Sequence, residues 1–170
     1  MLSNSNSLNI ILLNTILIII WHLIVLIFSI KLNTNFFNPN RKIYLKRSWE
    51  QNGKFYTNIL KIKKWKDLLP QYISKNGFSK KSIMLNSARD KKYIDRFILE
   101  TCRAEWNHLM CSMYGIVLFF INFIIKNSWI YSVMFSFLAI IANLPYLFIQ
   151  RFNRIRLNKY INHNKNIVTV

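Results

Sequence analysis

Three apolar runs, separated by polar sequence, dominate the hydrophobic pattern of this chain. They cover about residues 8–30, 106–125 and 129–149, and the first contains no charged residue. A helix rises 1.5 Å per residue, so each run is long enough to cross a hydrocarbon core of roughly 30 Å. The pattern therefore predicts an all-α integral membrane protein with three transmembrane helices.

The first run could instead be a cleaved signal peptide. No basic region precedes it, its length exceeds the usual apolar core of a signal peptide, and no small-residue cleavage site follows. We therefore expect a retained first span. Within it, Asn14 and His22 are expected to form hydrogen bonds between helices rather than to bind a ligand.

Charge is distributed unevenly around these runs. The chain is 52% hydrophobic with a formal net charge of +18, and 18 of its 24 basic residues and all six acidic residues lie in residues 31–105. Basic residues beside apolar spans suit the anionic cytoplasmic leaflet better than nucleic acid. We predict one membrane domain over residues 1–170, with membrane lipids as partners and no nucleic acid.

The same bias sets the expected topology. By the positive-inside rule, the basic amphipathic segment 31–105 and the tail 150–170 are cytoplasmic. The N-terminus of this multi-pass protein then lies outside the cell membrane, and the C-terminus lies in the cytoplasm.

The basic segment carries further local patterns. Apolar residues recur on one side of residues 48–69, which predicts an amphipathic helix in the membrane interface, ended by Pro70. Residues 71–86 show no period and are interpreted as a loop. Ser87 and Asp90 resemble a capping box that opens a helix running towards Glu105.

Two polar stripes follow the helical period into the second and third spans. Only residues 126–128 separate these spans, so the two helices should form an antiparallel hairpin in which the stripes share one depth. Pro145 is expected to kink the third span near that level. The first stripe comprises Thr101, Glu105, His108 and Ser112, and the second comprises Asn143, Leu147, Gln150 and Arg154.

A glutamate and a histidine three residues apart on a helix allow acid–base chemistry. Glu105 can orient His108, which would then remove a proton from a substrate hydroxyl. The alternative is an interfacial pair that only fixes helix packing. Four arginines can either bind the phosphate of a donor or lipid or serve as positive-inside anchors: Arg103, Arg151, Arg154 and Arg156.

Other catalytic patterns are missing from the sequence. Cys102 and Cys111 are too few for a disulfide framework and have no ligand-like spacing with the histidines. There is no glycine-rich phosphate loop and no GxSxG element. We expect neither a metal site nor a disulfide.

Four short motifs occur in order between Trp49 and Leu157. They are GKF at residues 53–55, KWK at 64–66, ETxRAExxH at 100–108 and IANxPxxxxQRxNRxRL at 141–157. Together they resemble the glycosyl-4,4'-diaponeurosporenoate acyltransferase family. That family is named for the membrane enzyme that completes staphyloxanthin by esterifying the glucose of a glycosylated C30 carotenoid acid with a fatty acid. The resemblance implies a small membrane acyltransferase that acts on the glucose 6-hydroxyl.

With this resemblance, the polar stripes acquire expected roles. His108 would be the base, with Glu105 orienting it, while Asn143, Gln150 and Thr101 would position the substrate or stabilise the oxyanion. The four arginines would bind donor phosphate or lipid. No bound cofactor is expected.

The expected co-substrate is a fatty-acyl thioester of coenzyme A or acyl carrier protein. The expected acceptor is a glycosylated carotenoid, and partners could include other enzymes of the pathway. Two alternatives stay open: the same chemistry on another membrane glycolipid, and a non-catalytic membrane scaffold or lipid-binding subunit.

Overall fold

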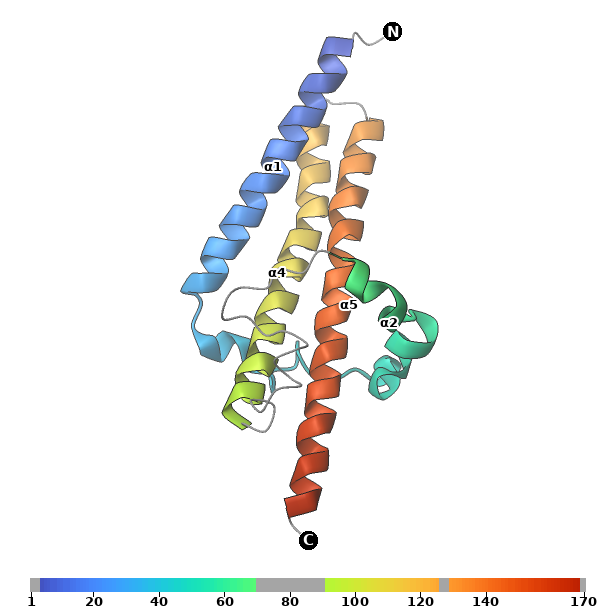
Figure 1. Ribbon diagram of the computed structural model, residues 1–170. Helices are drawn as coiled ribbons and strands as arrows, with labels where there is room; N and C mark the ends of the chain where they lie inside the picture. The colour runs from blue at the N-terminus through green and yellow to red at the C-terminus, as the bar shows by residue number, and fades with distance from the viewer. Residues whose placement is uncertain (1–3, 70–90, 126–128, 169–170) are drawn as a thin grey trace. The chain divides into compact units, whose positions relative to one another are not determined.

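Long helices account for most of the described chain. The computed structural model describes residues 4–69, 91–125 and 129–168, and within these ranges it contains helices and no strand. The long helices are α1 (Asn4–Lys31), α4 (Lys91–Ile124) and α5 (Trp129–Val168), shown in Figure 1. Each includes a stretch long and apolar enough to cross a membrane, at Ser7–Lys31, Lys92–Ile124 and Trp129–Ile161. The predicted all-α fold with three membrane-spanning helices is confirmed.

Helices α4 and α5 extend well beyond the apolar runs that predicted them. Residues 91–105 and 150–168 contain neither glycine nor proline, so nothing in the backbone interrupts the helices. These extensions also bury an apolar face, because Ile94 and Ile98 of α4 pack with Leu157 of α5. The helix predicted to run towards Glu105 is therefore the first part of α4.

The chain divides into two compact units. The bundle unit contains Met1–Leu32 and Trp106–Leu147, and the polar unit contains Asn33–Glu105 and Phe148–Val170. Helices α4 and α5 contribute to both units, while α1 belongs to the bundle unit.

The bundle unit packs α1 against parts of α4 and α5. Its core forms around Tyr114 and Leu118, and Trp21 of α1 stacks on Tyr114 with 4.6 Å between the ring centroids. A Cβ atom on Gly115 would lie 2.6 Å from the carbonyl oxygen of Ser136. Glycine at this position therefore permits the close approach of α4 and α5.

Buried amides connect α1 to α4. Asn14 Nδ2 donates to Asn122 Oδ1 at 3.1 Å, and Asn122 Nδ2 donates back to Asn14 Oδ1 at 2.7 Å. The predicted interhelical role of Asn14 is confirmed. For His22, a hydrogen bond to another helix was predicted. Its exposed ring instead bonds the carbonyl oxygen of Ile18 on its own helix at 2.8 Å.

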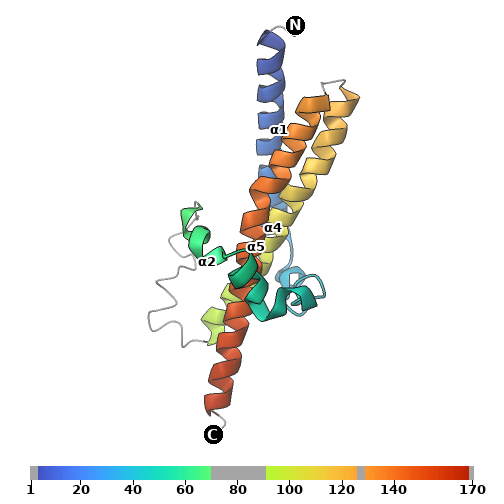
Figure 2. The ribbon, with the colours of Figure 1, turned by 90° about the vertical axis from the view of Figure 1, so that its right-hand side faces the viewer.

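Between α1 and α4 in the sequence, the described part of the polar unit contains short helices. The segment from η2 (Ser48–Gly53) to η4 (Lys66–Leu68) lies beside α5 (Figure 2), where Tyr56 and Ile62 are fully buried together with Phe152. Phe37, at the end of the first short helix, is also fully buried. The short helices are η1 (Thr34–Phe37), η2 (Ser48–Gly53), η3 (Phe55–Ile59), α2 (Ile62–Trp65) and η4 (Lys66–Leu68).

The prediction of one amphipathic helix over residues 48–69 is wrong. The backbone is left-handed at Asn52 and Lys61, with φ of 55° and 48°, which a continuous right-handed helix does not allow. Ile59 is exposed whereas Ile62 is fully buried, so the apolar residues that the pattern assigned to one side of a helix do not share one buried face. The segment folds to bury particular side chains against α5, and that packing overrides the local period.

Three predictions fall on residues that the structure does not describe. They are the loop at residues 71–86, the capping box at Ser87 and Asp90, and the link at residues 126–128.

Pro145 lies inside α5, which continues as a helix on both sides of it.

Candidate active site

A histidine and an asparagine from different helices meet inside the bundle unit. The ring Nδ1 of His108 on α4 lies 3.1 Å from Oδ1 of Asn143 on α5. Asn143 Nδ2 donates at 2.9 Å to the carbonyl oxygen of Ala139, one turn earlier on α5. The opposite orientation of this amide would place Oδ1 against that carbonyl, so the hydrogen bonds favour the orientation described.

This arrangement selects one tautomer of the neutral imidazole. An amide oxygen only accepts hydrogen bonds, so His108 Nδ1 must carry the proton that it donates to Asn143. The lone pair of the neutral ring then lies on Nε2. His108 therefore presents Nε2, and not Nδ1, as its proton acceptor.

An aromatic ring restricts the same histidine further. The rings of His108 and Tyr146 stack with 4.9 Å between their centroids and 13° between their planes. His108 stays half-buried in this position. We call His108, Asn143 and Tyr146 the His108 site.

The polar unit holds a buried network of four charged side chains. Arg151 donates from Nε to Glu50 Oε1 at 2.9 Å and from Nη1 to Glu105 Oε1 at 2.5 Å. Arg154 donates from Nη2 to Glu105 Oε2. None of the four residues is more than 7% exposed. The negative charges of two carboxylates thus balance the positive charges of two guanidinium groups, which offsets the desolvation cost of burying four charged side chains. These four residues form the arginine–glutamate network.

Glu50 is the member of this network that sequence analysis missed. Its carboxylate also accepts from the Tyr56 hydroxyl and from the backbone N–H of Arg47, each at 2.5 Å. Burial raises the pKa of this carboxyl, but the hydrogen bonds from Arg151, Arg47 and Tyr56 outweigh that effect and leave the pKa below its usual value. The available signal was that Glu50 is the only acidic residue among the first 66.

Arg151 additionally holds the chain that leads into η2. Its Nη1 and Nη2 atoms donate to the carbonyl oxygens of Ile43 and Leu45 at 3.3 Å and 3.0 Å. The donors of Arg151 are therefore shared among two carboxylates and two backbone carbonyls. Phosphate binding by Arg151 and Arg154 stays a prediction, and the hydrogen bonds of both residues favour a structural role.

The two polar stripes, which were predicted to share one depth, contact each other. His108 meets Asn143 in the bundle unit, and Glu105 meets Arg154 in the polar unit. Both carboxylate oxygens of Glu105 are bonded by arginines, and the Nδ1 atom of His108 is bonded by Asn143. Asn143 thus occupies the orienting position that sequence analysis gave to Glu105.

The other predicted site residues have separate surroundings. The Thr101 hydroxyl donates to a carbonyl of its own helix at 2.6 Å. Arg103 pairs with Glu100 at 2.8 Å, one turn away on α4. Arg156 is exposed and Gln150 is half-buried, both on α5. Their assigned roles in binding substrate, donor or lipid stay predictions.

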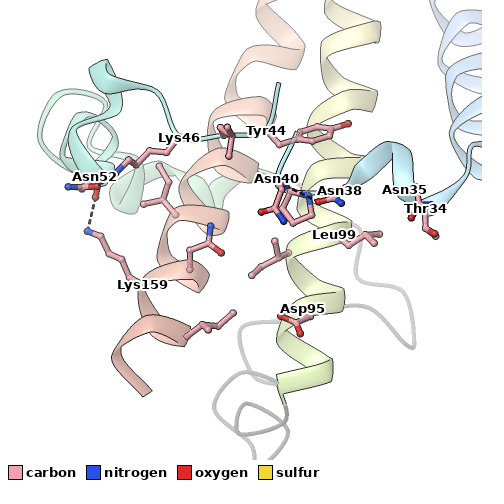
Figure 3. A pocket seen from close by; sticks show the side chains of 16 residues that line it. Thr34, Asn35, Asn38, Asn40, Tyr44, Lys46, Asn52, Asp95, Leu99 and Lys159 are labelled. Carbon is pink, nitrogen blue, oxygen red and sulfur yellow. Dashed lines mark hydrogen bonds between the residues drawn. The ribbon is translucent and has the colours of Figure 1, made fainter. Parts of the chain in front are cut away.

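A cavity of about 830 Å³ lies in the polar unit (Figure 3). Its size falls within the range of roughly 300–1,000 Å³ that is common for small-molecule sites. Five asparagines line it together with Lys46, Lys159 and Asp95. The described lining residues come from four separate stretches of the chain, which is why no local motif predicted the cavity.

Taken together, the three apolar helices and the His108 site define a multi-pass membrane protein in which a histidine and an asparagine bond each other between two of its helices. The family model described as glycosyl-4,4'-diaponeurosporenoate acyltransferase matches residues 40–163. The chain belongs to this family and is an acyltransferase. The matched range includes both the His108 site and the arginine–glutamate network.

Curated relatives carry the same description. A glycosyl-4,4'-diaponeurosporenoate acyltransferase of Staphylococcus aureus strain N315 is 28% identical over 128 residues, which cover 74% of this chain and 72% of the relative. The enzyme of the same name from strain bovine RF122 / ET3-1 is 27% identical over 128 residues, with the same coverage. No solved structure matches the chain. The family resemblance drawn from the four motifs is confirmed.

Proposed function

We propose that this protein transfers a fatty acyl chain from a thioester donor to the glucose 6-hydroxyl of a glycosylated C30 carotenoid acid, as the last step of a staphyloxanthin-type synthesis. The relatives are named for a glycosyl-4,4'-diaponeurosporenoate acceptor, which supports this choice of substrate. The observation that carries the mechanism is the hydrogen bond from His108 Nδ1 to Asn143 Oδ1.

In this mechanism His108 acts as general base and then as general acid. Its Nε2 atom takes the proton of the sugar hydroxyl while the hydroxyl oxygen attacks the thioester carbonyl carbon. A C–O bond forms, the C–S bond breaks when the tetrahedral intermediate collapses, and the imidazolium returns the proton to the leaving thiolate. The products are an ester and a free thiol, so no further reactant is needed.

Asn143 is a positioning residue in this proposal. Its oxygen fixes the Nδ1–H of His108, and one of its two amide N–H groups bonds the Ala139 carbonyl oxygen. The second amide N–H keeps the proposed role in substrate positioning or oxyanion stabilisation. Gln150 keeps the proposed role in substrate positioning or oxyanion stabilisation. The one hydroxyl donor of Thr101 bonds the carbonyl oxygen of Ile98 on its own helix, so we do not assign Thr101 to the oxyanion. Tyr146 limits rotation of the imidazole by stacking on it.

The membrane setting suits the two apolar substrates. His108 lies in a helix apolar enough to span the membrane, so an acyl chain and a carotenoid acceptor would reach it laterally from the lipid. We propose that the N-terminus is outside the cell membrane and the C-terminus is cytoplasmic, because most basic residues lie in residues 31–105 and after residue 150. The polar part of the donor would then arrive from the cytosol.

The test uses membranes that contain the protein, a glycosylated C30 carotenoid acid and palmitoyl-coenzyme A. The ester is quantified by mass spectrometry for wild type, His108→Ala and the matched control His22→Ala, at equal membrane abundance. We expect ester from wild type and His22→Ala, and at least a 100-fold loss in His108→Ala. Full activity of His108→Ala would exclude His108 as the base.

Regiochemistry is tested with an acceptor that carries 6-deoxyglucose. We expect no ester from it, because the proposed nucleophile is missing. Ester formation on this acceptor would show that another hydroxyl is acylated.

A further inference from the structure

We infer that the cavity of the polar unit binds the phosphate groups of the acyl donor. The identity of the donor rests on the proposed function, but the site itself rests on the residues that line the cavity. The volume of about 830 Å³ leaves room for an extended polar ligand rather than for a single ion. The chemistry of the lining then decides which ligand fits.

Two lysines from distant parts of the chain meet at one residue of the cavity wall. Lys46 Nζ donates to the side-chain oxygen of Asn52, and Lys159 Nζ donates to the backbone oxygen of Asn52 at 2.7 Å. Figure 3 shows the two lysines reaching Asn52 from different sides, with Asp95 projecting from α4. Both lysines are exposed and therefore accessible to a ligand.

The charges at this point favour an anion. Two ammonium groups on one residue repel each other, and the bonds to Asn52 are made to neutral oxygens, which do not cancel the charge. Among the described residues of the lining, Asp95 is the only acidic side chain. A phosphate between the lysines would relieve the repulsion and accept charge-assisted hydrogen bonds from both. A neutral sugar would supply no such compensation.

The wall that carries Lys46 is fixed before any ligand arrives. Arg151 bonds the carbonyl oxygens of Ile43 and Leu45, on either side of Tyr44. The Arg154 guanidinium lies 5.6 Å from the centre of the Tyr44 ring, which itself lines the cavity. The arginine–glutamate network thus holds the backbone next to Lys46, which reduces the ordering cost of binding.

The asparagines add hydrogen-bonding capacity around the lysines. Asn35, Asn38, Asn40 and Asn158 line the cavity with Asn52. Amide side chains both donate and accept, so they suit the hydroxyl and amide groups that accompany phosphate in a pantetheine-type donor. The lining as a whole therefore fits a phosphorylated carrier of the acyl chain.

The test measures direct binding, so that its outcome does not depend on ester formation. The full-length protein is placed in phosphatidylcholine nanodiscs, and the Kd values of coenzyme A and pantetheine are measured by calorimetry. The variants are Lys46→Gln/Lys159→Gln and the control Lys64→Gln, which removes an exposed lysine outside the cavity lining. Thermal unfolding midpoints are compared to ensure that all proteins are folded.

We expect coenzyme A to bind wild type and Lys64→Gln alike, and at least about tenfold more weakly to the double variant. Pantetheine lacks the phosphates and should bind all three proteins weakly and equally. Equal coenzyme A affinity in the double variant, or equal losses for both probes, would overturn the inference. A failure of the proposed function is detected by a different measurement. It would abolish ester formation in the membrane assay and leave the Kd values of coenzyme A and pantetheine unchanged.

A second arm separates the donor from a lipid headgroup. Phosphatidylglycerol is added to the nanodiscs, and its competition with coenzyme A is measured in wild type, in Lys64→Gln and in the double variant. We expect no competition beyond the effect of its surface charge, which Lys64→Gln reports equally. Specific competition that the double variant removes would assign the cavity to lipid phosphate and overturn the donor assignment.

Discussion

The Nδ1 atom of His108 lies 3.1 Å from Oδ1 of Asn143, across two helices and 35 positions of the sequence. The second hydrogen bond of the same amide, to Ala139, leaves Asn143 one favourable orientation. A neutral side chain therefore sets the tautomer of the proposed base. Asparagine can hold the imidazole in this way without competing for the proton that the base must take.

Asn143→Ala should lower kcat by about 100-fold, because the loss of the acceptor frees the ring to rotate and to change tautomer. The apparent KM for the thioester donor should change little. Ester formation by mass spectrometry at several donor concentrations gives both parameters. A variant with wild-type kcat would show that Asn143 does not position His108. Asn153→Ala, a half-buried asparagine later on α5, serves as the matched control and should retain activity.

Arg151→Met should lower the free energy of unfolding by about 3–5 kcal/mol, because Glu50 and Glu105 lose a buried partner. Glu50→Gln/Arg151→Met should lose less than the sum of the two single variants, since the double change removes part of the uncompensated charge. Denaturant unfolding in detergent measures these values. Arg156→Met, at an exposed position on α5, should stay within about 0.5 kcal/mol of wild type. Strict additivity of Glu50 and Arg151 would argue against a coupled network.

Acid should destabilise the protein through Glu50. Its pKa in the folded state lies below the usual 4.5, because the hydrogen bonds to the ionised carboxylate outweigh the effect of burial. The resulting stabilisation is fully present above pH 4.5 and is lost as the pH falls through the folded pKa. Unfolding midpoints measured between pH 3 and 6, on a grid of about half a unit, should show a shallower acid slope for Glu50→Gln. Identical slopes in both proteins would contradict the prediction.

High pH should destabilise the protein through the ionisation of Tyr44. Burial, followed by the nearby Cys102 and Glu105, raises the pKa of Tyr44 from 10.0 to about 12. A raised folded pKa means that the stabilisation is present below pH 10 and is lost as the pH rises towards 12. Tyr44→Phe should flatten the alkaline slope in this window. Phenolate absorbance during titration provides an independent measurement, and ionisation at the usual pKa would disprove the shift.

Gly115→Val should separate α4 and α5 within the bundle unit. Even a Cβ atom would lie 2.6 Å from the Ser136 carbonyl oxygen and 2.7 Å from Ile140 Cγ1, so backbone must move. We expect a loss of about 1–3 kcal/mol in unfolding free energy, as is usual for overpacking. Val117→Ala, at an exposed position nearby, should have a much smaller effect. Unchanged unfolding of Gly115→Val would show that the helices are not closely packed here.

The sequence determined the features that depend on local composition and period. Three apolar runs were enough to locate the membrane helices, because transfer into lipid depends on the side chains of one segment and needs no knowledge of its neighbours. The helical period and the short link also predicted that the two polar stripes lie at one depth, and the structure then paired His108 with Asn143 and Glu105 with Arg154.

Only the tertiary structure decided the features that depend on distant partners. Glu50 and Arg151 are 101 positions apart, and the residues next to Glu50 in the sequence do not indicate that its carboxylate is buried against Arg151. Residues 48–69 have a helical period, yet the burial of Tyr56 and Ile62 against α5 breaks them into short turns. The cavity is assembled from four stretches in the same way. A period records which face of one segment is apolar, whereas hydrogen-bond partners and cavities depend on which segments meet, and the whole folded chain sets that.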